Sequence, residues 1–151
     1  MLFHNLAAAT FMVAVTTAIH FFGLAGLIAV IRRDRWRGSS TSSPLRQGGA
    51  LLAVVFGLVA LHTFEIWAYA IFYMTVGEFD TLEEALYFAT STFTTVGFGD
   101  ITLGKEWRVF SAIESASGFL LMGWSTAFLV TVTARLRLLE AELQDRREHP
   151  Q

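Results

Sequence analysis

The chain lacks cysteine and carries little charge of either sign. With no cysteine among its 151 residues, it can form neither disulfides nor thiolate metal sites. Charged residues make up 16%, where soluble domains have roughly a quarter. The net charge of −2 argues against nucleic acid as a partner. A Ser-His-Asp set, a metal-ligand spacing and a phosphate-binding loop are also missing, so we expect no enzyme, no cofactor and no small-molecule substrate.

The residues that are abundant are apolar. They account for 54% of the chain and give a mean hydropathy of +0.51, which indicates an integral membrane protein. Residues 6–31, 50–76 and 107–134 form long apolar runs, each exceeding the roughly 20 residues that a bilayer requires. A signal peptide is the alternative for the first run. Because no basic segment precedes it and the run is too long, we predict a retained transmembrane helix.

A fourth apolar segment, residues 82–94, is too short to cross a membrane. Thr81 and Glu84 have the spacing of a capping box, which predicts that a helix begins here after a break at residues 77–80. Such a helix fits a re-entrant segment whose carboxyl end points toward the membrane centre. The negative end of its dipole would favour a cation there.

The segment Thr94-Thr95-Val96-Gly97-Phe98-Gly99-Asp100 follows directly. It resembles the selectivity filter of the potassium channel family, whose loop reads TVGYG, with Phe98 in place of the tyrosine. A membrane turn that happens to contain Gly-Phe-Gly is the alternative. The longer match in a helix–loop–helix setting favours the filter.

The resemblance implies an all-α membrane protein with three transmembrane helices, a re-entrant pore helix and a selectivity-filter loop. One filter per chain implies a homotetrameric pore. The expected parts are an extra N-terminal helix (1–31), a cytoplasmic basic linker (32–49), a pore domain (50–135) and a short helical tail (136–151). Within the pore domain we expect an outer helix at 50–76, the pore helix at 82–94, the filter at 95–99 and an inner helix at 107–134.

The filter would bind K+, the permeant ion, through backbone carbonyls. Turning successive carbonyls to one side needs alternating backbone conformations, some with positive φ, which glycine tolerates. The expected ion-binding residues are Thr95, Val96, Gly97, Phe98 and Gly99.

By resemblance, four residues support the filter: Tyr87, Phe88, Ser91 and Asp100. Tyr87 and Phe88 would form an aromatic cuff, and Tyr87 would hydrogen-bond Asp100. Many bacterial members have a glutamate at the position of Ser91, so the brace between two carboxyl groups is missing. Phe98 also lacks the anchoring hydroxyl of tyrosine. Both differences predict a less rigid filter.

Arginines set the expected orientation. Residues 32–49 contain five arginines and one aspartate, and Arg135 and Arg137 follow the last span. The positive-inside rule places both clusters in the cytoplasm, which leaves the N-terminus and the filter mouth outside a bacterial plasma membrane. Binding of anionic membrane lipids is an alternative use of the first cluster.

Several residues are candidates for gating. Gly118 and Gly123 suit either a hinge or close helix packing. His62, Glu65 and Glu114 suggest either a structural polar network or a proton-sensitive gate, with Ser91 or Thr92 as expected partners of Glu114.

Two further histidines and the C-terminal tail give no indication of function. His4 and His20 receive no role. A stripe of Val132, Leu136, Leu139 and Leu143 suits a short coiled coil or an amphipathic helix.

Together these features predict a potassium-selective channel that conducts passively across the membrane. The alternatives are a weakly selective cation channel of the same fold, a subunit of a potassium uptake transporter, and a non-conducting regulatory subunit. Nothing in the sequence identifies a gating ligand.

Overall fold

The structure, a computed structural model, describes the backbone of residues 2–37 and 44–148 and the side chains of residues 2–32 and 48–135. Four helices make up this part of the chain: α1 (Leu2–Arg37), α2 (Pro44–Thr75), α3 (Leu82–Phe93) and α4 (Arg108–Glu148). The predicted all-α class is therefore confirmed. Three of the helices are long and apolar enough to cross a membrane.

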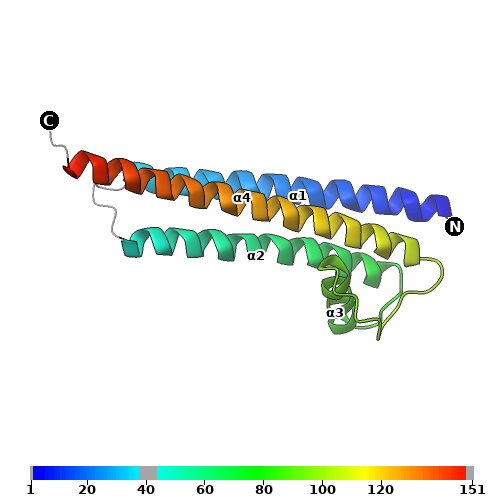
Figure 1. Cartoon of the computed structure of the whole chain (residues 1–151). Coiled ribbons are helices and arrows are strands. Elements are labelled where there is room, and N and C mark those ends of the chain that lie inside the picture. The colour runs from blue at the N-terminus through cyan, green and yellow to red at the C-terminus, as the bar shows by residue number, and fades with distance from the viewer. Residues whose placement is uncertain (1, 38–43, 149–151) are drawn as a thin grey trace.

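The three long helices lie side by side, and the short helix α3 is set at one end of the bundle (Figure 1). Helix α1 packs against both α2 and α4, and α3 packs between the same two helices. The first residues of α1 lie at the end of the bundle that carries α3, whereas α4 ends at the opposite end (Figure 1). The arrangement places the N-terminus on the same side as the filter-like loop.

The long helices extend beyond the predicted apolar runs. Helix α1 continues through Arg37 and α2 already begins at Pro44, so most of the predicted linker at 32–49 is helical. Helix α2 ends one residue early, and α3 ends at Phe93 with Thr94 as its C-cap. Helix α4 begins one residue late and continues to Glu148. Hydropathy marks the segment that fits the bilayer, but a helix can continue into water.

The outward face of the bundle is apolar, as a lipid-facing surface requires. Phe11, Phe22, Phe56 and Phe119 are all largely exposed in the single chain. Inside, near α3, aromatic rings form the core: Phe72 of α2 stacks on Phe110 of α4 with ring centroids 4.3 Å apart. This packing joins α2, α3 and α4 into one unit below the loop.

Close contact between α1 and α2 depends on two glycines. A Cβ atom on Gly23 would lie 2.3 Å from the Leu61 side chain, and one on Gly57 would lie 3.0 Å from Leu27. Small residues allow helix backbones to approach in this way inside membranes. The extra N-terminal helix therefore packs on its own chain.

The start of α3 is fixed by its cap. The Thr81 hydroxyl accepts a hydrogen bond from the Glu84 N–H at 3.3 Å, and Glu83 and Glu84 occupy the first turn near the positive end of the helix dipole. The far end of α3 leads through Thr94 directly into the glycine-containing loop.

Candidate functional site

The backbone of residues 95–99 alternates in conformation. Thr95, Gly97 and Gly99 have φ values of 62°, 55° and 77°, whereas Val96 and Phe98 stay outside the positive-φ region. Glycine adopts positive φ without a steric cost, but Thr95 pays one. Because strained backbone persists only where the surroundings impose it, the conformation at Thr95 makes this loop a candidate functional segment.

Ser91 of α3 holds the loop at two points. Its carbonyl oxygen accepts a hydrogen bond from the Gly97 N–H at 3.1 Å, and its hydroxyl accepts one from the Phe98 N–H at 3.3 Å. The Thr95 N–H donates to the Thr92 carbonyl at 3.0 Å. The serine that replaces the family's glutamate thus provides a different brace, which the sequence did not suggest.

Tyr87 supports the loop from its outer side. Its hydroxyl donates to Asp100 Oδ2 at 2.7 Å, and its ring stacks on Phe98 with centroids 6.1 Å apart. This hydrogen bond holds the pKa of Asp100 below its ordinary value, against a smaller opposing effect of desolvation, and raises the pKa of Tyr87. Phe88, the other expected cuff residue, packs instead on Tyr73 and Phe79.

The side chains of the loop are not covered by their own chain. Val96 is 55% exposed and Phe98 is 67% exposed, although both are apolar. Within the single chain, these two apolar side chains therefore remain uncovered. Beside the loop lies a cavity of about 590 Å³, which α3, the loop and the first turns of α4 line.

Gly118 lets α4 pass directly under the end of α3. A Cβ atom there would lie 2.1 Å from the Phe93 carbonyl oxygen, whereas one on Gly123 would meet nothing within 4 Å. One turn before Gly118, the Ser115 hydroxyl donates to the Thr92 carbonyl at 2.7 Å. Of the two expected uses of Gly118, the structure shows the close packing.

These elements form an outer helix, a short capped helix, a strained loop and an inner helix, in that order. The model of a protein family described as "Ion channel" matches residues 59–135, about half of the chain. The chain belongs to the ion-channel family. The resemblance to the potassium-channel pore is thereby confirmed, and the channel is a multi-pass membrane protein rather than an enzyme. Comparisons with curated proteins and with solved structures found no match.

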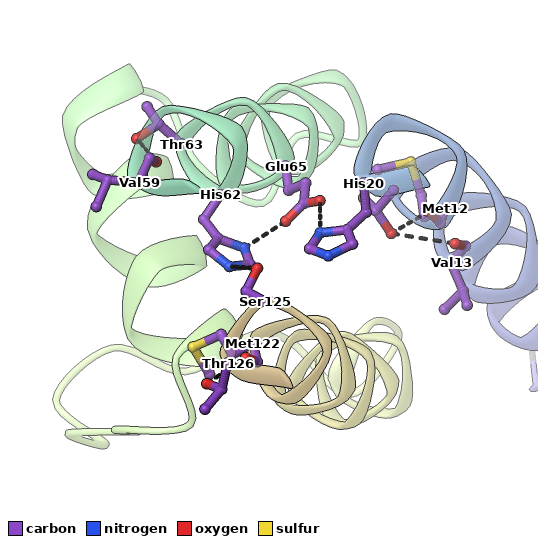
Figure 2. Close-up of polar contacts among 11 residues, drawn as sticks. Met12, Val13, His20, Val59, His62, Thr63, Glu65, Met122, Ser125 and Thr126 are labelled. Atoms are coloured by element: carbon purple, nitrogen blue, oxygen red, sulfur yellow. Dashed lines mark hydrogen bonds and ion pairs between the residues drawn. The ribbon is translucent and has the colours of Figure 1, made fainter. Parts of the chain in front are cut away.

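Behind the pore unit of the channel, a buried polar cluster joins the three long helices (Figure 2). Glu65 of α2 contacts His62 Nδ1 of the same helix at 2.7 Å and His20 Nδ1 of α1 at 2.9 Å. His62 Nε2 lies 2.9 Å from the Ser125 hydroxyl of α4. The predicted pairing of His62 with Glu65 is present. Whether it acts as a structural network or as a proton-sensitive gate stays a prediction.

Glu114 does not meet the partners expected for it. It is buried beside the aromatic core and accepts a hydrogen bond from the Tyr73 hydroxyl. The Ser91 hydroxyl instead accepts from the Phe98 N–H of the loop, and the Thr92 carbonyl accepts from the Ser115 hydroxyl of α4. The expectation was wrong because the sequence position of Glu114 indicates its depth in the membrane but not how α4 is rotated about its axis, which decides the residues that Glu114 contacts. Glu114 Oε1 has no partner among the described residues.

Two residues of α1 were missed by sequence reasoning: His20 and Asn5. The Asn5 side chain accepts from the Phe110 N–H at 3.1 Å and donates to the Glu106 carbonyl, so it satisfies the start of α4. A signal for both was present. The buried positions of α1 include the polar or small residues Asn5, Ala9, Thr16 and His20, at helical spacing on an otherwise apolar helix.

Proposed function

We propose that this channel is potassium-selective and conducts K+ passively across the plasma membrane. The observation that carries the proposal is the alternating backbone of the Thr95–Gly99 loop, with positive φ at every second residue. Such a backbone can turn successive carbonyl oxygens toward one axis. Those oxygens would replace the hydration shell of K+, and ions would move between adjacent sites by knock-on.

A homotetramer fits the state of the loop in the single chain. One protomer supplies one wall of a filter, and four walls are needed to surround an ion. The exposure of Val96 and Phe98 supports assembly, because apolar side chains that lie next to a filter must be covered by something. Neighbouring copies of the same surface, related by a four-fold axis, would cover them.

Two features favour a cation at the inner end of the filter. Helix α3 ends at Phe93, immediately before the loop, so the negative end of its dipole faces the ion path. The Thr95 side chain would add a hydroxyl oxygen at that end. For the orientation, we propose that the N-terminus and filter mouth lie outside and the C-terminus lies in the cytoplasm, as the arginine clusters indicate.

Ion flux into liposomes that contain the purified full chain tests the proposal. We expect K+ and Rb+ to enter on the order of tenfold or more faster than Na+. Gly97→Ala should abolish this selectivity, since Gly97 has a φ of 55°. Gly26→Ala is the matched control, because a Cβ atom on Gly26 meets nothing within 4 Å.

Two outcomes contradict the proposal. Equal rates for K+ and Na+ would identify a weakly selective cation channel of the same fold, for which the missing hydroxyl at Phe98 would be an explanation. The absence of flux from correctly assembled protein would identify a non-conducting regulatory subunit.

A further inference from the structure

The buried cluster behind the pore has the donor atoms of a metal site. One ligand atom each from His20, His62 and Glu65 can be chosen so that all lie within 4.8 Å of one another. The residues come from two helices, and His20 and Glu65 are separated by 45 positions in the sequence. Two imidazoles and one carboxylate are a ligand set that zinc proteins use.

The distances in the cluster are close to those around a single ion. His20 Nδ1 and His62 Nδ1 lie 2.9 Å and 2.7 Å from the two oxygens of Glu65. Ligand atoms around tetrahedral Zn2+ lie about 3.3 Å apart, given bonds of about 2.0–2.1 Å. To bind an ion, the two contacts with Glu65 must lengthen by about half an ångström, and ligand atoms that now lie up to 4.8 Å apart must come to the same spacing.

The negative charge of the cluster also favours a bound cation. Glu65 and His20 are completely buried, and among the described side chains no lysine or arginine pairs with Glu65. Both oxygens of Glu65 contact imidazole nitrogens instead, and if those rings are neutral the buried carboxylate has no positive partner. A divalent ion held by all three side chains would supply one.

The surroundings provide orientation and access. The Ser125 hydroxyl lies 2.9 Å from His62 Nε2, which leaves Nδ1 of that ring as the atom for the ion. Partners of this kind fix the ring orientation of metal-bound histidines. The His62 side chain is 18% exposed, so the cluster has an open edge at which a water molecule could complete the coordination.

We propose that His20, His62 and Glu65 bind one divalent transition metal ion of the zinc type per chain, and that the ion ties α1 to the pore unit. The site does not depend on the ion selectivity of the filter. Because His20 is the only ligand from α1, the ion links the N-terminal helix to α2, and through Ser125 the linkage reaches α4.

Metal binding by the untagged, purified full chain tests the proposal. After removal of metals with a chelator, we expect zinc to bind at one ion per chain, and cobalt to give the visible absorption of a four-coordinate site. His20→Gln removes a direct ligand and should weaken binding by at least the order of tenfold that loss of an outer-shell partner costs. His4→Gln, at an exposed position of the same helix, should leave binding unchanged.

A second measurement separates binding from folding. Zinc should raise the unfolding temperature of the wild-type and His4→Gln channels but not that of His20→Gln. The absence of saturable binding in the wild type would overturn the proposal, even if the His20→Gln variant fails to fold. Equal binding by wild type and a folded His20→Gln variant would overturn it as well.

Discussion

Ser91 provides two of the hydrogen bonds that hold the Thr95–Gly99 loop, one through its carbonyl oxygen and one through its hydroxyl. Only the hydroxyl can be removed by mutation. Ser91→Ala would leave the Phe98 N–H without its acceptor, which costs about 1–3 kcal/mol when the group is kept from water. We expect a less stable tetramer and faster inactivation, measured by thermal unfolding and by the decay of current at constant voltage.

Ser111→Ala is the matched control for this substitution. Ser111 lines the same cavity, but its hydroxyl donates to the Arg108 carbonyl within its own helix. The Ser111→Ala substitution should therefore leave inactivation unchanged. A Ser91→Ala channel with wild-type stability and inactivation would show that the hydroxyl does not brace the loop.

The hydrogen bond between Tyr87 and Asp100 predicts a pH dependence. The bond lowers the pKa of Asp100, so its stabilisation is present above the ordinary carboxyl pKa and is lost as the pH falls through the lowered value. Tyr87→Phe removes the bond and should raise the Asp100 pKa. The external pH at which protons reduce K+ current should then shift upward. Asp100→Asn should abolish this component, and an unchanged midpoint in Tyr87→Phe would contradict the prediction.

At the scale of the helices, the two glycines of α4 should behave differently. Gly118→Ala forces a Cβ atom to within 2.1 Å of the Phe93 backbone, so either α3 or α4 must move. Overpacking of this kind costs about 1–3 kcal/mol. Gly123→Ala has free space and should be neutral or slightly stabilising, because alanine favours helix. Thermal unfolding and open probability of both variants check this. Similar effects of the two would favour a hinge over packing.

The helices also show which structural features the sequence could predict and which it could not. Apolar runs, the Thr81 cap and the Thr94–Asp100 motif are local signals, so the spans, the short helix and the loop could be read directly. The partners of His20 and Glu114 depend on how each helix is rotated about its axis. The spacing of polar and small residues along α1 indicates which face is buried. It does not identify the partner, because the contact from His20 to Glu65 joins residues 45 positions apart.

Helix α1 also stabilises the start of α4. Asn5 accepts from the Phe110 N–H, one of the groups left without an intrahelical partner at a helix start, and donates to the Glu106 carbonyl just before the helix. Asn5→Ala should lower the unfolding free energy by about 1–3 kcal/mol, while Asn5→Asp, which keeps the acceptor, should recover part of the loss. Equal losses in both variants would indicate that the amide donor matters more than the acceptor.

At the scale of the whole molecule, the single chain leaves apolar side chains uncovered at the Thr95–Gly99 loop. The three long helices contact one another through Glu65, Asn5 and the aromatic core, but in the described part of the chain the Val96 and Phe98 side chains of the Thr95–Gly99 loop stay exposed. If four copies meet there, the permeant ion stabilises the assembly, because it binds only the assembled state. Mass action then couples K+ concentration to assembly: an ion at 100 times its Kd adds about 2.7 kcal/mol of stability.

This coupling predicts a measurable ion dependence. The unfolding temperature of the assembled channel should rise when K+ replaces Na+ at constant ionic strength, and native mass spectrometry should show four chains at high K+. Gly97→Ala should lose the K+ effect while keeping its helices, since it distorts the loop alone. The response to zinc through His20 should persist in that variant, because its ligands lie outside the loop. Equal unfolding temperatures in K+ and Na+ would mean that the loop does not form a closed ring of K+ ligands.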